Sequence, residues 1–198
     1  QLNAGVTFAG GGFHRVGGGT TSVNAALSGP NFGLDGGALT GAGSLTVSGT
    51  FNWSGGTRSG SGATVLNGGA VLNIQGGAIT AGTHTIQGAG TVNWTTGVLF
   101  GGPLTVATAL NFIGGSDKVI ENGTLNVAGN TTWSGTGNLF LNSALGLSAI
   151  LNIQPGGVFE VQNNQNITNN FANGVSAINN AGTLRKTVGT GATTGQNR

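Results

Sequence analysis

Phe51-Asn52-Trp53, inside the stretch GSLTVSGTFNWSGG (Gly43–Gly56), is the motif that decides the fold. Its residues alternate between large apolar and small polar side chains, as expected for a β-strand with one buried and one exposed face. The pattern recurs about every twenty residues, which is the sequence signature of a repeat architecture. Its copies are Phe51-Asn52-Trp53, Leu72-Asn73-Ile74, Val92-Asn93-Trp94, Leu110-Asn111-Phe112, Thr131-Thr132-Trp133 and Leu151-Asn152-Ile153.

Two more series of mostly apolar residues run in step with this motif. The first series is Val47, Val65, Ile86, Val106, Val127, Leu147 and Ile167, and the second is Leu39, Ser59, Ile79, Leu99, Ile120, Phe140, Phe159 and Ile178. Three short strands in each repeat are typical of a coil that stacks on itself. We therefore predict an all-β fold, a right-handed parallel β-helix (β-solenoid) with about nine rungs of about 20 residues and three short strands each.

The three tryptophans occupy one position of the repeat. Trp53, Trp94 and Trp133 alternate there with Ile74 and Phe112. Wide indoles between smaller neighbours let successive layers interdigitate. We therefore expect the tryptophans in the core, and a platform for sugar stacking is the alternative.

Glycine is very frequent, with 42 of 198 residues, and only 5% of the residues are charged. A hydrophobic fraction of 37% and the regular apolar series argue against disorder, because disordered chains are usually rich in charge and proline. Pairs such as Gly55-Gly56 and Gly101-Gly102 fall between the expected strands. Tight corners there need backbone conformations that glycine adopts easily.

The repeat pattern continues without a linker, so we predict a single β-solenoid domain over residues 1–198. Residues 1–37 fit the spacing least well and are expected to form irregular first rungs. Residues 187–198 contain few large apolar side chains and are expected to form a frayed tail. The chain begins at Gln1 instead of Met, which suggests a processed protein or a piece of a longer one.

Three segments resemble the repeats of very large bacterial surface and secreted proteins. They are Gly43–Gly56, Gly69–Gly77 (GAVLNIQGG) and Asn179–Gly191 (NNAGTLRKTVGTG). Such proteins are similar to autotransporter passengers and filamentous-haemagglutinin-like adhesins. The resemblance implies a parallel β-helix over most of the chain and an extracellular or cell-surface location, and it brings no particular ligand. The absence of cysteine is compatible with export.

Few residues offer catalytic chemistry. The acidic residues are Asp35, Asp117, Glu121 and Glu160. Asp117, Lys118 and Glu121 form the one local charged cluster, which we interpret as a charged turn that keeps an edge soluble. A site acting on polysaccharides would need several carboxylates. His14 and His84 are far apart in sequence and have no acidic neighbour at ligand spacing, so we expect no metal, no other cofactor and no enzyme.

The distribution of charged and of apolar residues also argues against nucleic-acid and membrane partners. The formal net charge of +2 rests on scattered residues, and Arg185-Lys186 is the one adjacent basic pair. Nucleic-acid binding needs clustered cations that neutralise phosphates. No apolar run reaches the roughly 18 residues of a membrane-spanning helix. We expect neither nucleic-acid binding nor membrane insertion.

The central polar residues of the motif are the candidate functional feature. If their flanking residues point inward, Asn52, Asn73, Asn93, Asn111, Thr132 and Asn152 form an outward row. Stacked asparagines can hydrogen-bond to one another along the coil axis. We therefore expect a structural or adhesive extracellular repeat module that builds a stalk, a surface layer or a head-to-tail filament. Its partners would be copies of itself or neighbouring rungs of the same parent protein.

The sequence leaves two alternative functions open. A flat row of amides and hydroxyls could be a glycan-binding adhesin face, with surface glycans as partners. The second alternative is a polysaccharide-acting enzyme or an ice-binding protein.

Overall fold

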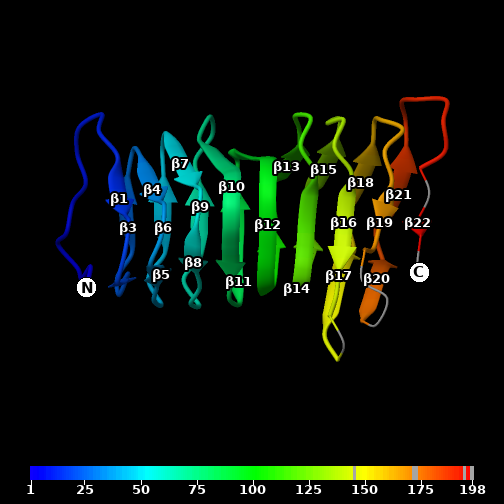
Figure 1. The fold of residues 1–198 in the computed structure, drawn as a ribbon. Helices are drawn as coiled ribbons and strands as arrows, with labels where there is room; N and C mark the ends of the chain where they lie inside the picture. Colours follow the sequence, from blue (N-terminus) through cyan, green and yellow to red (C-terminus); the bar gives the residue numbers. More distant parts are fainter. Residues whose placement is uncertain (145, 171–173, 194, 197–198) are drawn as a thin grey trace.

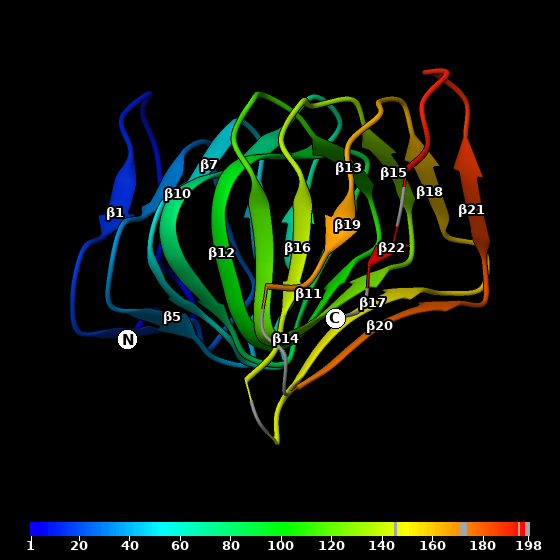
Figure 2. The ribbon, with the colours of Figure 1, turned by 45° about the vertical axis from the view of Figure 1, so that its right-hand side comes forward.

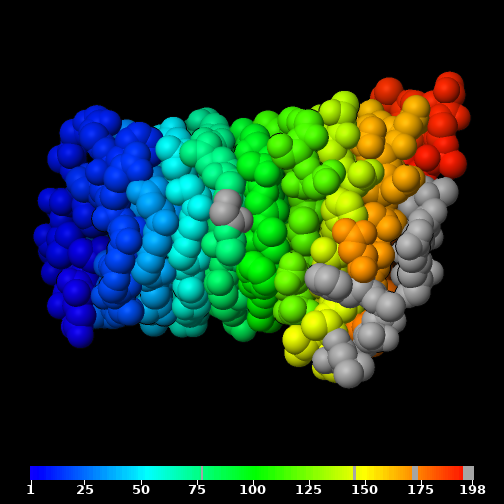
Figure 3. All heavy atoms as spheres, viewed as in Figure 1, coloured from blue at the N-terminus to red at the C-terminus, as the bar shows by residue number. Residues whose placement is uncertain are grey.

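The computed structural model describes residues 1–144, 146–170, 174–193 and 195–196. These residues form an all-β parallel β-solenoid of about eight turns, with rungs about 21 residues apart and no helix (Figure 1). The chain advances along one axis, so its segments follow one another as bands from end to end (Figure 3). The predicted fold class is confirmed, with about eight turns in place of about nine rungs. The right-handed winding stays a prediction.

Each turn contributes strands to three faces of the coil. The first face consists of β1 (His14–Val16), β4 (Phe32–Leu34), β7 (Thr50–Trp53), the starts of β10 (Val71–Ala81) and β12 (Thr91–Val106), β13 (Ala109–Phe112), β15 (Asn130–Trp133), β18 (Val158–Val161) and β21 (Thr183–Lys186). The second face consists of β2 (Thr20–Ser22), β5 (Ala38–Thr40), β8 (Gly56–Arg58), the end of β10, the middle of β12, the start of β14 (Lys118–Val127), β16 (Leu139–Asn142), β19 (Ile167–Thr168) and β22 (Gly195–Gln196).

The third face completes each turn. It consists of β3 (Leu27–Gly29), β6 (Leu45–Val47), β9 (Thr64–Leu66), β11 (His84–Gly88), the ends of β12 and β14, β17 (Ser148–Ile153) and β20 (Val175–Asn180). Strands of neighbouring turns pair in parallel on all three faces. Because a parallel stack repeats each position in every turn, side chains form columns along the axis.

The long strands in the middle of the coil bend around corners without a break, as β12 and β14 show (Figure 2). In β12 the corner lies at Gly101 and Gly102, whose φ angles are 74° and 112°. A Cβ atom on Gly102 would lie 2.5 Å from the carbonyl oxygen of Thr124 in the next turn. Glycine is therefore required at this corner both by conformation and by close approach.

The core is a narrow apolar column that large side chains fill. Trp53, Trp94 and Trp133 are at most 1% exposed. On the first face they alternate in register with Ile74 and Phe112, as the sequence predicts. The rings of Trp94 and Phe112 meet edge to face with centroids 5.2 Å apart. The interpretation of the tryptophans as core residues is confirmed, because their faces are covered by the neighbouring turns.

The predicted inward series on the third face is wrong at three positions, Val65, Leu147 and Ile167. Leu66, not Val65, stacks in the core, where it is fully buried. Leu147 is 50% exposed, and Ile153 pairs with Val127 in its place. Corners of unequal length shift the phase of the following strand, so a count of about twenty residues does not resolve which neighbour points inward.

The predicted inward series on the second face also needs correction. Arg58 pairs with Leu39 where the sequence pattern suggested Ser59. Leu141 follows Ile120 in the core, and Phe140 points outward. Three other residues lie on different faces from those expected: Phe159 on the first, Ile178 on the third and Ile167 on the second.

The two ends of the chain belong to the same coil. Residues 14–16 pair in parallel with residues 32–34, and the irregularity expected of the first rungs over 1–37 stays a prediction. Near the other end, β22 pairs with β19. Residues 194, 197 and 198 of the expected tail lie outside the described residues, and its fraying stays a prediction.

Replacing Trp94 by Ala should reduce the free energy of unfolding by roughly 3–5 kcal/mol, because a fully buried indole leaves a cavity between two turns. Asn93→Ala is the matched control on the same strand, and its outward side chain should contribute only about 1 kcal/mol. Denaturant titration followed by circular dichroism measures both. Equal losses would contradict the orientation of this strand, in which Trp94 points inward and Asn93 outward.

Candidate functional site

Polar side chains of the first face form a ladder along the coil axis. Asn52, Asn73, Asn93, Asn111 and Thr132 occupy the same outward position in successive turns. The Nδ2 of Asn73 donates to the Oδ1 of Asn52 at 3.0 Å. The Nδ2 of Asn111 donates to the Oδ1 of Asn93 at 3.1 Å. These amides therefore link neighbouring turns, and part of their hydrogen-bonding capacity is used inside the protein.

Asn152 does not belong to this ladder. It lies on the third face, where its Nδ2 donates to the Oδ1 of Asn126 at 2.8 Å and its Oδ1 accepts from Asn179 at 2.8 Å. Asn126 in turn donates to the hydroxyl of Thr105 at 3.2 Å. The grouping of Asn152 with the first-face motif is therefore wrong. The tripeptide pattern apolar-Asn-apolar occurs on two faces, and spacing alone does not distinguish them.

Charged side chains lie at the two ends of the first-face ladder. Arg15 precedes it, and its Nη1 donates to Asp35 at 2.6 Å. Glu160 and Arg185 follow Thr132, and the Nε of Arg185 donates to Glu160 at 2.9 Å. The middle of the ladder thus carries neutral amides and a hydroxyl, and the ion pairs lie near its ends.

Hydrogen bonds hold both of these carboxylates in the ionised form. Donation by Arg15, and then by Ser54, lowers the pKa of Asp35. Donation by Gln162, Arg185 and Thr187 lowers the pKa of Glu160 to about 2. Both end pairs therefore stay charged at neutral pH.

The predicted charged cluster does not converge on a site. Lys118 is fully buried, and its Nζ donates to the carbonyl oxygens of Ile113 at 2.5 Å and Ser116 at 2.6 Å. Asp117 is exposed and accepts from the backbone N–H of Asn138 at 2.7 Å. Glu121 is half-buried on the outer side of the second face. Strand alternation turns Lys118 inward and Glu121 outward, so the cluster separates.

A buried polar cluster that the sequence reasoning missed lies at a corner between the second and third faces. Arg58 is 1% exposed, and its Nη1 donates to the carbonyl oxygens of Ser59 at 2.9 Å and Leu39 at 3.2 Å. The hydroxyl of Thr64 lies 3.3 Å from the Nε of Arg58 and 3.0 Å from the Nε2 of His84. A basic residue at an inward position of the repeat was the available signal, and the assignment of Ser59 to that position hid it.

Burial changes the titration of this cluster. Desolvation lowers the pKa of Arg58 to about 10. Desolvation, together with the nearby charge of Arg58, lowers the pKa of His84 to about 3. His84 is therefore neutral at pH 7, and its ring is a hydrogen-bonding group between two turns. The described residues give Arg58 no acidic partner at ion-pair distance.

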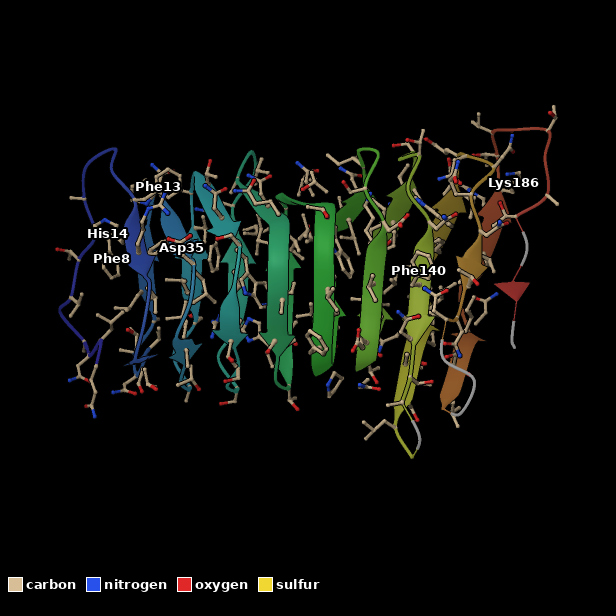
Figure 4. All side chains as sticks on the ribbon, viewed as in Figure 1. Phe8, Phe13, His14, Asp35, Phe140 and Lys186 are labelled. Atoms are coloured by element: carbon tan, nitrogen blue, oxygen red, sulfur yellow. The ribbon has the colours of Figure 1, made fainter. Side chains whose placement is uncertain are left out.

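The two ends of the coil are hollowed. At the amino-terminal end a cavity of about 280 Å³ is lined mainly by apolar residues, among them Leu2, Phe8, Val23 and Phe32. At the other end a cavity of about 250 Å³ is lined by Ile167, Ile178, Leu184 and Lys186, among other residues. Figure 4 places Phe8 and His14 at one end and Lys186 at the other. Both hollows are places where the apolar core is uncovered.

The part of the chain that the structure describes contains no group of three or more His, Asp or Glu side chains that could hold a metal ion. The same residues form no helix of the length and hydrophobicity needed to cross a bilayer.

No protein-family model, curated protein or solved structure matches the chain. The resemblance to surface and secreted β-helix proteins is therefore supported at the level of the β-solenoid fold alone.

His84 predicts a pH dependence of stability. Its pKa is lower in the folded protein than the ordinary value of 6.5, so the unfolded chain takes up the proton first. The free energy of unfolding should therefore fall as the pH decreases from about 6.5 towards about 3, by at most about 1.4 kcal/mol per pH unit from this group. Urea titrations from pH 7 to pH 4 on the wild type and on His84→Gln measure it. The variant should lose less stability on acidification, and identical slopes would contradict the prediction.

Proposed function

We propose that this chain is a structural module of the cell surface or of the extracellular space. In this proposal it is a stiff β-solenoid segment that extends by stacking its end rungs on those of a second copy or of the same parent polypeptide. The observation that carries the proposal is the pair of mainly apolar hollows at opposite ends of the coil.

The uncovered core gives the ends a reason to associate. In the middle of the coil each inward side chain is covered by the turns on both sides, as Trp94 is by Ile74 and Phe112. At the carboxyl-terminal end Leu184 is 43% exposed. Burial of apolar surface contributes roughly 25 cal/mol per Å², so a rung placed on either end would be stabilised by the same contacts as an internal rung.

The edge strands offer the second component of such a contact. β21 is exposed along its length and ends the first face, and β1 begins that face. Unpaired N–H and C=O groups of an edge strand are a template for another strand. Because the faces run in the same order in each turn, one copy could continue the coil of another, and a contact of this head-to-tail kind extends into a fibre.

Charge would regulate this contact. Direct stacking would bring Arg185 of one copy beside Arg15 of the next, each with its own carboxylate. Charged side chains at sheet edges oppose non-specific pairing. Salt screens charges on exposed groups, so we expect end-to-end association to strengthen with ionic strength.

The outward ladder fits a structural role better than a ligand-binding one. Asn52, Asn73, Asn93 and Asn111 hydrogen-bond in pairs between turns, which restrains the coil against bending and twisting. Low charge and the absence of cysteine support an extracellular or surface setting.

Thr21→Lys tests the stacking. Thr21 points inward on β2 and lines the amino-terminal hollow, so a lysine there places an ammonium group where the next rung would pack. End-to-end association, measured by sedimentation velocity over a concentration series, should weaken at least about tenfold because an unpaired charge would be buried. The control is Thr57→Lys, at an outward position of β8 in the middle of the coil, which should associate like the wild type. A wild type that stays monomeric at all concentrations would contradict association with a second copy.

A further inference from the structure

The outer side of the second face carries two phenylalanines among four neighbouring apolar side chains. Val98, Val119 and Phe140 form one outward row across successive turns. Phe100 lies beside this row, two residues further along β12. All four are half-buried, whereas Leu99 and Ile120 between them are fully buried in the core. We call Val98, Phe100, Val119 and Phe140 the Phe platform; Phe140 is labelled on β16 in Figure 4.

The Phe platform is not needed by the core. The outward ladder of the first face holds asparagine and threonine, and the third face holds Thr105, Asn126 and Asn152 outward, besides Val65 and Ile150. A contiguous apolar patch with a polar rim on a protein surface marks a place where something binds. Thr80 and Glu121 provide that rim, in register with Phe100 on either side.

Among the described residues, Glu121 is the one ionisable side chain that points outward from the strands of the second face. It pairs in register with Phe100, and the structure gives its carboxylate no hydrogen bond or ion pair among the described residues. Lys118 on the same strand does not neutralise it, because the Nζ of Lys118 is held inside by Ile113 and Ser116. A free acceptor therefore lies next to an aromatic ring.

We propose that the Phe platform and Glu121 bind an uncharged polysaccharide that crosses the outer side of the second face. Sugar rings have apolar C–H faces that pack on aromatic rings, and their hydroxyl groups donate hydrogen bonds to a carboxylate. Phe100 and Phe140 are two turns apart, about 10 Å along the axis, and two residues, about 7 Å, apart along the strands. A sugar chain that contacts both rings therefore runs obliquely to the axis.

The charge of this face selects against acidic glycans. Its one outward ionisable group among the described residues, Glu121, is an acid with no cation at ion-pair distance, so an anionic chain would be repelled. A neutral chain has no such penalty. This inference concerns a different face from the Asn ladder and does not depend on end-to-end stacking.

Binding to neutral oligosaccharides tests the proposal. Isothermal titration calorimetry with cellohexaose and chitohexaose, and with oligogalacturonate as the anionic probe, measures affinity for each sugar. We expect binding of at least one neutral probe and none of the anionic probe. Phe140→Leu keeps an apolar side chain but removes the ring face, and it should weaken binding about tenfold. Glu121→Gln should weaken it several-fold, and thermal unfolding checks that both variants stay folded.

Asn93→Ala is the matched control on the first face and should bind the neutral probe like the wild type. The proposal is overturned if no neutral probe binds, if Phe140→Leu and Phe100→Leu both bind normally, or if Asn93→Ala alone abolishes binding. It is also overturned if the platform variants instead remove a lateral dimer seen by sedimentation, because the platform would then be a contact with a second copy.

Discussion

Parallel stacking of successive turns is the constraint on which the rest of this structure depends. Each strand pairs with its counterparts in the turns before and after, so a position that points inward in one turn points inward in the next. An inward residue must therefore fit two neighbours at once. Trp94 does so between Ile74 and Phe112, and the alternation of wide and narrower side chains keeps the core filled. The outward columns follow from the same rule, because asparagines stacked in register can link one turn to the next.

Inward polar residues are tolerated where a corner supplies carbonyl groups. The guanidinium of Arg58 and the ammonium of Lys118 both donate to backbone carbonyl oxygens near these corners. Burying either cation is costly, and these hydrogen bonds offset part of the cost. With two of the basic residues inside, the exposed cations at the two ends of the first face become the most prominent charges on that face. Because Lys118 donates to carbonyl oxygens inside the coil, it forms no ion pair with Glu121 beside the Phe platform.

The sequence predicts the period, the parallel stacking and the tryptophan core, because these depend on alternation within single strands. It does not predict which face a strand joins. Leu151-Asn152-Ile153 follows Thr131-Thr132-Trp133 by the same step as earlier copies, yet β18 occupies the first face and β17 the third. Longer corners between Asn142 and Ser148 change the phase there without changing the local pattern. Phe140 and Leu141 illustrate the same limit, because either could point inward until the register with Val119 and Ile120 is known. The cluster of Arg58 and His84 stayed hidden for this reason too.

Disulfide formation between engineered cysteines tests the register most directly, because the chain contains no cysteine of its own. Neighbouring parallel strands lie about 4.8 Å apart, within the Cα separation of about 4.4–6.8 Å that a disulfide spans. The structure places Asn126 and Asn152 in adjacent turns of one column, and Thr132 on a different face. Under mild oxidation the double variant Asn126→Cys/Asn152→Cys should cross-link rapidly in the folded protein, and Thr132→Cys/Asn152→Cys should not. Rapid cross-linking of the second pair in place of the first would contradict the stacking of turns described for this protein.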